Sequence, residues 1–207
     1  MTPGVVVDVG NTRIKWGRCS PTAVAAVAAL APDDPAAWAE QAEAWGLVAG
    51  TVWAVTGVHP PRRQALQEWA IGRGDAVVSI DHPRLLPLRV VLGRPDHVGM
   101  DRLLDAVAAN SRRPAGTPAV IVDAGSAVTV DYVDGTGAFA GGTIMPGLRL
   151  MAEALHDYTA LLPLVEVPRR VPPALGTSTP AAMESGIFRA VAGGIHMLIR
   201  EFSTLSV

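Results

Sequence analysis

Several features that would point to particular classes of protein are scarce or missing in this sequence. It has a single cysteine, Cys19, which excludes an internal disulfide bond and cannot build a zinc site alone. Its longest uninterrupted apolar run, residues 23–31, is far shorter than the roughly 20 residues that a membrane-spanning helix requires. The N-terminus also has no basic segment and no apolar signal-like segment. These absences predict a soluble, cytoplasmic protein that has no membrane partner.

An excess of charge of one sign is also missing. There are 17 Lys and Arg residues against 19 Asp and Glu residues, which gives a formal net charge of -2. Because nucleic-acid-binding proteins usually have a basic excess, we expect no nucleic-acid partner. The five histidines show no metal-ligand spacing, and no G-x-S-x-G segment is present, which disfavours a histidine metal centre and a serine hydrolase. Hydrophobic residues make up 49% of the chain, as in ordinary globular proteins.

Strand and helix signals alternate along the chain, which indicates an α/β fold. Apolar segments predict strands at residues 5–9, 13–17, 51–58 and 76–80, and a strand-turn-strand within residues 120–133. Apolar periodicity and helix-start signals predict helices after Asp34 and Pro35, and at residues 63–71, 100–110, 148–158 and 180–202. The segment 111–118 is the best linker candidate, and G-G-T-I-M-P-G at 141–147 is interpreted as a glycine-rich loop.

An internal repeat relates the two halves of the chain. V-D-V-G-N around Asp8 and V-D-A-G-S around Asp123 both place an aspartate at the end of an apolar strand, followed by a glycine turn. A duplicated unit of this kind predicts two similar half-domains that face each other across a cleft. Chance similarity between two hairpins is the alternative, because D-x-G turns are common in hairpins.

The repeated segment suits phosphate chemistry. A glycine turn lets backbone N–H groups approach phosphate oxygens, and the aspartate can hold Mg²⁺ directly or through water. Lys15, on the returning strand, can reach a phosphate as a point charge. The sequence has neither G-x-x-x-x-G-K-[ST] nor G-x-G-x-x-G, so it predicts neither a P-loop nor a Rossmann site. The alternative for Asp8 is a turn aspartate that bonds its own backbone.

A second candidate site lies at the start of the helix expected at residues 100–110. There Asp101 is at a position where the helix dipole stabilises a carboxylate, and it can accept a proton from a substrate hydroxyl. The adjacent Arg102 can bind a carboxylate with two hydrogen bonds. The alternative is that Asp101 only stabilises the start of the helix and that Arg102 is a solvated surface residue.

Five segments in order resemble the type III pantothenate kinase family of the acetate kinase and actin-like superfamily. They are D-V-G-N-T-R-I-K at 8–15, G-M-D-R at 99–102, D-A-G-S-A-V-T-V-D at 123–131, G-G-T-I-M-P-G-L at 141–148 and L-G-T-S-T-P-A-A-M-E-S-G at 175–186. The resemblance implies an α/β protein of two facing actin-like (ribonuclease H-like) half-domains with a central cleft, at residues 1–113 and 114–207, the second shortened at its C-terminal end. It also implies a homodimer whose interface includes the G-G-T-I-M-P-G segment at 141–147.

The activity that this resemblance implies is ATP-dependent phosphorylation of pantothenate to 4'-phosphopantothenate, the first step of coenzyme A biosynthesis. Asp101 would accept the hydroxyl proton, Asp123 would bind K⁺ or NH₄⁺, and Asp8 would lie near Mg²⁺. The implied ATP contacts are Asp8, Val9, Gly10, Asn11, Thr12, Arg13, Ile14, Lys15 and Ser126. The implied pantothenate contacts are Leu92, Gly99, Met100, Asp101, Arg102 and Thr179.

The sequence departs from the family at Leu92, where a tyrosine usually faces pantothenate, and at its C-terminal end. Two alternatives therefore stay open. One is a non-catalytic accessory or regulatory relative, and the other is a kinase of the same superfamily that acts on another small hydroxylated acid.

Overall fold

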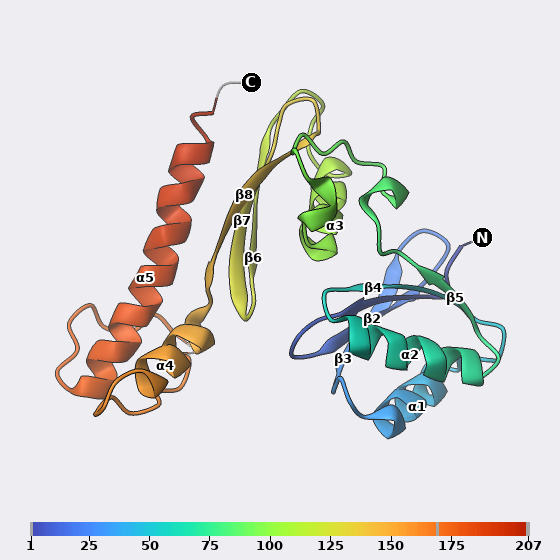
Figure 1. Cartoon of the computed structure of the whole chain (residues 1–207), viewed down its shortest axis with the longest axis horizontal. Helices are drawn as coiled ribbons and strands as arrows, with labels where there is room; N and C mark the ends of the chain where they lie inside the picture. The colour runs from blue at the N-terminus through green and yellow to red at the C-terminus, as the bar shows by residue number, and fades with distance from the viewer. Residues whose placement is uncertain (1, 169, 206–207) are drawn as a thin grey trace. The chain divides into compact units, whose positions relative to one another are not determined.

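A computed structural model describes residues 2–168 and 170–205 of the 207-residue chain. The chain divides into two compact units. The first unit comprises Met1–Pro87 and Asp96–Leu104, and the second comprises Leu88–Pro95 and Asp105–Val207. Each unit has its own sheet and helices (Figure 1), so each is described by itself.

The first unit is built on a five-stranded sheet with the order β3-β2-β1-β4-β5. Its strands are β1 (Val5–Val9), β2 (Ile14–Cys19), β3 (Val24–Leu30), β4 (Val52–Gly57) and β5 (Ala76–Ser79). β1, β2 and β3 pair antiparallel, whereas β4 pairs parallel with both β1 and β5. The parallel pair puts the carboxyl ends of β1 and β4 side by side, with Val9 opposite Gly57.

Two helices, α1 (Pro35–Ala44) and α2 (Pro60–Gly72), pack on one face of this sheet. α1 begins where the sequence predicts, because the Asp34 side chain accepts hydrogen bonds from the backbone N–H groups of its first turn. The core between sheet and helices is rich in tryptophan. Trp16, Trp38 and Trp53 are buried, and Trp45 and Trp69 pack against them.

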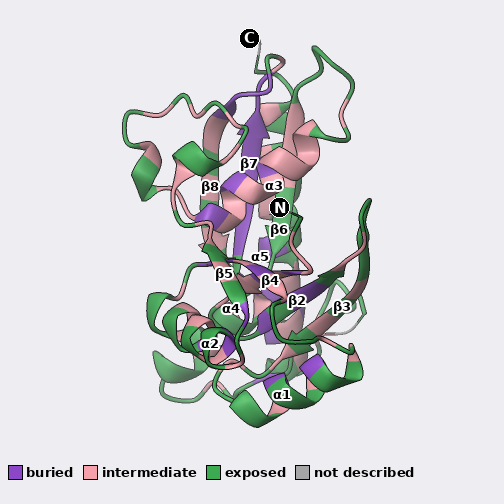
Figure 2. Ribbon diagram, turned by 90° about the vertical axis from the view of Figure 1, so that its right-hand side faces the viewer, coloured by how far each residue is buried: buried purple, intermediate pink, exposed green. Residues whose placement is uncertain are grey.

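The second unit has a three-stranded antiparallel sheet with the order β6-β7-β8. Its strands are β6 (Ala119–Ala124), β7 (Ala127–Val133) and β8 (Phe139–Pro146). The central strand β7 is buried along most of its length (Figure 2) because it is paired on both sides and packed by α5 (Thr179–Phe202). α4 (Leu148–Asp157) packs against α5 around Ala152, Met183 and Ile187.

Along the chain, β5 and β6 are connected by a segment that contains two short 3-10 helices and a longer α-helix. These are η1 (Pro83–Leu85), η2 (Pro95–His97) and α3 (Met100–Asn110). α3 is divided between the units, because its residues up to Leu104 belong to the first and those from Asp105 to the second. The boundary expected between residues 113 and 114, and the cleft between two facing halves, stay predictions.

The α/β class and most of the predicted elements are confirmed, with two corrections. Residues 141–146, predicted as part of a glycine-rich loop, lie in strand β8, which pairs with β7 along its length. The alanine-rich segment at residues 24–30, for which no strand is predicted, forms β3 on the edge of the first sheet. Within the described part of the chain, no helix is both long enough and apolar enough to cross a membrane.

Candidate functional site

The predicted phosphate loop is the tight connection between β1 and β2. Its turn is closed by a hydrogen bond from Gly10 N to Arg13 O of 3.0 Å. The register pairs Asp8 with Lys15, whose Nζ lies 3.7 Å from Asp8 Oδ2 in an ion pair at the surface. A carboxylate and an ammonium group are thus held together beside a glycine turn, and these are groups that Mg²⁺ and phosphate can bind.

A side chain from α2 fixes this loop from outside. The guanidinium of Arg62 donates to Asn11 O through Nη1, and to both carboxylate oxygens of Asp33 at 3.0 and 2.8 Å. Two parallel hydrogen bonds to a carboxylate orient an arginine more strictly than one does. Arg62 therefore ties the tip of the phosphate loop to the segment before α1, a contact that the sequence did not indicate.

The G-M-D-R segment begins α3, as predicted. Asp101 Oδ1 accepts a hydrogen bond of 2.9 Å from Arg102 N, so the carboxylate is held at the positive end of the helix. A Cβ atom on Gly99 would lie 2.4 Å from Asp101 Oδ1 and 3.8 Å from Val58 Cγ1. Gly99 is therefore packed between the carboxylate and the residue that follows β4. This places the G-M-D-R segment at the edge of the sheet where β1 and β4 end.

The end of β4 supplies two residues that the sequence analysis missed. Thr56 is opposite Asp8 in the parallel register, and Gly57 is opposite Val9. Gly57 has a φ of +143°, and a Cβ atom there would lie 2.3 Å from Val9 O, so only glycine fits. A threonine followed by a glycine at the end of an apolar strand could have indicated these residues from the sequence. The end of β1 has a similar pattern, with Asp8 near its last residue and Gly10 immediately after the strand.

A cavity of about 840 Å³ opens on the face of the first sheet that carries Asp8. Its wall is mostly apolar, with contributions from Ala54, Ile80 and Leu104, and its charged members are Asp8, Arg13 and Lys15. Within the first unit, the phosphate loop and an apolar pocket therefore share one lining.

The second repeat forms the connection between β6 and β7. Gly125 N donates to Ala127 O at 2.9 Å, and Ser126 O accepts a hydrogen bond of the same length from Gly147 N. Gly147 is the N-cap of α4, so the D-A-G-S turn lies against the end of the G-G-T-I-M-P-G segment at 141–147. Ser126 and Leu148 also line a small cavity of about 310 Å³. Two segments that are distant in sequence, the D-A-G-S turn and the end of β8, thus meet at this turn.

The remaining predicted residues also lie in the second unit. Asp123 is exposed near the end of β6, and Thr179 begins α5 immediately after the N-cap Ser178. Leu92 is half-buried and follows a segment that bridges to β8, where Val91 N donates to Phe139 O at 3.0 Å. The first unit therefore places Asp8 opposite Lys15 and Thr56 on adjacent strands, and Gly99 of the G-M-D-R segment near Val58, which follows β4. The second unit brings together Ser126 and Gly147 before α4.

The donor set at these turns fits cations that share their ligands with a phosphate. In residues 2–168 and 170–205 no group of three or more His, Cys, Asp or Glu side chains could hold a metal ion by itself. Mg²⁺ in phosphoryl-transfer sites is commonly held by one or two carboxylates together with substrate phosphates. Asp8 offers one such carboxylate beside the first glycine turn, and Asp123, predicted to bind a monovalent cation, offers one near the second.

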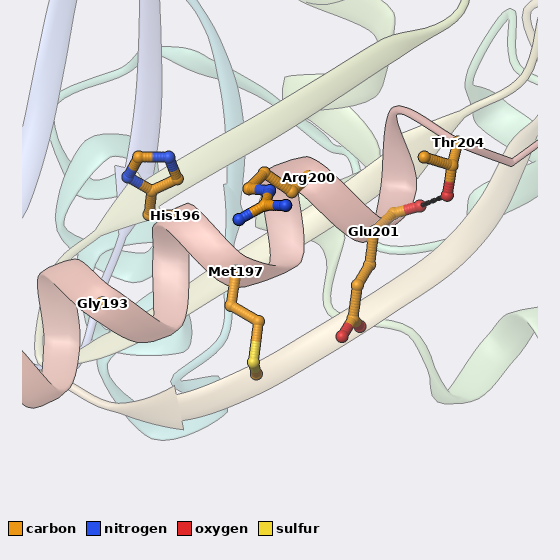
Figure 3. A pocket seen from close by; sticks show the side chains of 6 residues that line it. All are labelled: Gly193, His196, Met197, Arg200, Glu201 and Thr204. Atoms are coloured by element: carbon orange, nitrogen blue, oxygen red, sulfur yellow. Dashed lines mark hydrogen bonds between the residues drawn. The ribbon is translucent and has the colours of Figure 1, made fainter.

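Another hollow, of about 650 Å³, lies along the C-terminal part of α5 (Figure 3). It is lined by Gly193, His196, Met197, Arg200, Glu201 and Thr204. Thr204 Oγ1 donates to Glu201 O at 2.7 Å, which closes the end of the helix. None of the predicted site residues lines this hollow, so it is separate from the candidate site.

Comparison with known proteins identifies the relatives of this chain. A family model described as type III pantothenate kinase matches residues 4–201. A type III pantothenate kinase of Gloeobacter violaceus is 32% identical over 208 residues, which cover 96% of this chain and 79% of that protein. One from Rubrobacter xylanophilus is 48% identical over 108 residues, and one from Paramagnetospirillum magneticum is 44% identical over 117 residues.

The extent of these matches differs between relatives. The aligned segments cover 40% of the Rubrobacter protein and 43% of the Paramagnetospirillum protein, so the chain matches less than half the length of these two. Among solved structures, the ethanolamine utilization protein EutJ from Carboxydothermus hydrogenoformans aligns with a TM-score of 0.43 and 14% sequence identity. That alignment covers 76% of this chain and 58% of EutJ.

Proposed function

Because the chain belongs to the type III pantothenate kinase family, we propose that it transfers the γ-phosphate of ATP to the hydroxyl group of pantothenate. The observation that carries this proposal is the family match over residues 4–201, which includes every predicted motif residue. The product would be 4'-phosphopantothenate, and the reaction would be the first step of coenzyme A biosynthesis. Because the phosphoryl donor is ATP, the proposed location is the cytoplasm.

The phosphate end of the reaction is assigned to the two glycine turns. Backbone N–H groups between Asp8 and Lys15, and the hydroxyl of Ser126, would bind phosphate oxygens. Lys15 offers a positive charge that is already positioned by its ion pair with Asp8. When bound, Mg²⁺ near Asp8 and K⁺ or NH₄⁺ near Asp123 would offset the charge of the phosphates. Positioning and charge neutralisation are the main requirements of phosphoryl transfer.

The acceptor end is assigned to the start of α3. Asp101 would accept the proton of the pantothenate hydroxyl, because its carboxylate is held at the helix N-terminus by Arg102 N. The Arg102 side chain would bind the pantothenate carboxylate, and Thr179 would contact the same substrate.

The test is phosphorylation of pantothenate by ATP in the presence of Mg²⁺ and K⁺, with the parent protein and Asp101→Asn. A positioned base contributes typically ~10²–10⁴-fold to a rate, so we expect Asp101→Asn to lower kcat by at least about 100-fold with little change in ATP binding. Asp157→Asn, an exposed aspartate at the end of α4, is the matched control and should leave kcat unchanged. A folded parent without this activity would point to the non-catalytic alternative.

One observation favours a second candidate substrate. Leu92 occupies the position of the family's tyrosine, so the substrate site lacks a phenolic hydroxyl there. A kinase for another small hydroxylated acid remains the alternative function, and a panel of hydroxylated acids with the same ATP assay separates the two. The alternative is favoured if another acid gives a higher kcat/KM than pantothenate.

A homodimer is also proposed. The support is the G-G-T-I-M-P-G segment, whose residues 141–146 lie in the edge strand β8 and expose the apolar side chain of Ile144. The corresponding test concerns the whole molecule and is given in the Discussion.

A further inference from the structure

The hydroxyl group of Thr56 is buried without a partner. Thr56 is 6% exposed, and among residues 2–168 and 170–205 its Oγ1 finds no hydrogen-bond acceptor or donor. Leaving a buried hydroxyl unpaired is unfavourable, and most buried polar atoms in proteins do have a partner. We therefore expect the partner of Thr56 Oγ1 to be a bound molecule and not another residue of the chain.

The strand register shows where this hydroxyl points. Trp53 and Val55 belong to the tryptophan-rich core on one face of the sheet. Side chains alternate along a strand, so Ala54 and Thr56 face the opposite side, and both line the cavity of about 840 Å³. Thr56 is directly opposite Asp8 on the neighbouring strand.

The chemistry around Thr56 favours an anionic oxygen as its partner. The cavity lining carries two cationic side chains, Arg13 and Lys15, against one carboxylate, Asp8. Arg13 lies in the β1–β2 connection, and Asp8 and Lys15 are paired on the two strands that it joins, so the charged part of the lining surrounds the predicted phosphate loop. A hydroxyl beside such a loop can donate a hydrogen bond to a phosphate oxygen at the point where the apolar wall begins.

We propose that the Thr56 hydroxyl donates a hydrogen bond to a phosphate oxygen of the bound nucleotide, which makes β4 a third phosphate-binding segment of the first unit. The inference rests on the proposed function and adds a residue to its nucleotide site. Gly57 makes the position possible, because its missing Cβ lets the end of β4 approach Val9 O. The T-G pair then contributes a hydroxyl and a close backbone approach, as the loop after β1 does.

Three variants and two measurements test the inference. Thr56→Val keeps the shape of the side chain and removes the hydroxyl, and Thr56→Ser keeps the hydroxyl. Thr51→Val is the matched control, because the Thr51 hydroxyl lies in the same unit and donates to Val48 O at 2.6 Å. For each variant we measure the melting temperature without ligand and the Kd for Mg²⁺ with the non-hydrolysable analogue β,γ-imido-ATP.

The two threonine sites are expected to respond in opposite ways. Thr56→Val should melt at the parent temperature or above it, since no internal hydrogen bond is lost, and its Kd should rise roughly 10-fold to 100-fold. Thr56→Ser should bind within about threefold of the parent. Thr51→Val should melt below the parent and bind the analogue with an unchanged Kd.

The outcomes that contradict the inference are separate from those that contradict the proposed function. An unchanged Kd for Thr56→Val, or a lower melting temperature with no loss of binding, would show a structural role and overturn the inference alone. A folded parent that does not bind the analogue would overturn the proposed function and the role of Thr56 with it.

Discussion

At the scale of single residues, Gly57 decides whether the ends of β1 and β4 can lie together. Its φ of +143° and the 2.3 Å distance from a Cβ to Val9 O make any side chain there collide with the neighbouring strand. We expect Gly57→Ala to lower the free energy of unfolding by about 2 kcal/mol or more, because the strain adds to a backbone overlap. Phosphate binding should weaken as well, since Thr56 and Asp8 would separate.

The first unit contains its own reporter for this test. All five tryptophans of the sequence lie in the first unit, in or against its core, so urea unfolding followed by tryptophan fluorescence measures that unit. Gly72→Ala is the matched control, because no atom lies within 4 Å of the added Cβ at the end of α2. The control should be neutral or more stable by up to about 1 kcal/mol. Equal stability of both variants would show that the strand ends tolerate a side chain.

The candidate site residues that the sequence predicts are those inside local patterns. Asp8, Lys15 and Asp101 belong to short segments in which a strand, a turn or a helix start is visible without the rest of the fold. Thr56 could not be predicted in this way, because its proposed role depends on the parallel pairing of β4 with β1. That pairing joins segments separated by two strands and a helix, and no local pattern encodes it.

At the scale of elements, the turn between β7 and β8 is organised by one carboxylate. Asp134 Oδ1 accepts hydrogen bonds from Thr136 Oγ1 at 2.6 Å, Thr136 N at 2.8 Å and Ala138 N at 3.0 Å. The hydrogen bond from the Thr136 hydroxyl lowers the pKa of Asp134 below its ordinary value of 3.8. Burial of the carboxylate raises this pKa, but the backbone N–H groups of Ala138 and Thr136 and the charge of Arg89 lower it further. The turn is thus stabilised by the charged form of Asp134.

A lowered pKa in the folded state has a defined effect on stability. The contribution of Asp134 is fully present above the unfolded pKa, and it is lost as the pH falls through the folded pKa. We expect Asp134→Asn to be less stable than the parent by about 1 kcal/mol at pH 7, and this difference to shrink below about pH 4. Urea unfolding at pH 7 and pH 3, followed by far-UV circular dichroism, measures it. A difference that stays constant between these pH values would contradict the role of the charge.

Two elements show why local propensity did not predict every strand. The segment 24–30 consists of alanine, valine and leucine, and alanine favours helices, yet it forms β3 because β2 offers it a full antiparallel partner with Trp16 opposite Ala28. The segment 141–146 contains two glycines and a proline, which are rare inside strands, yet it pairs with β7 from Thr129 opposite Ile144 to Tyr132 opposite Gly141. In both cases pairing with a neighbouring strand overrides the preference of the residues.

At the scale of the whole molecule, the α/β class follows from the alternating pattern of the sequence, but the extent of each unit does not. The first unit ends at Pro87 and resumes at Asp96, because the intervening segment pairs with β8 of the second unit. This division depends on a bridge between Val90 and Phe139, residues far apart in the chain. Prolines punctuate the stretch from Pro83 to Pro95, but they do not indicate which strand the segment pairs with.

The proposed homodimer predicts that β8 carries an interface in solution. Ile144 is 64% exposed on this edge strand, and burial of such an apolar side chain between subunits is favourable, whereas a lysine there would have to be buried with its charge. We expect the parent to have the mass of a dimer by multi-angle light scattering and Ile144→Lys to have the mass of a monomer at the same concentration. Ile71→Lys is the matched control, since Ile71 is 59% exposed on α2 of the first unit and should leave the dimer intact. A monomeric parent would contradict the homodimer, and a dimeric Ile144→Lys would move the interface away from β8.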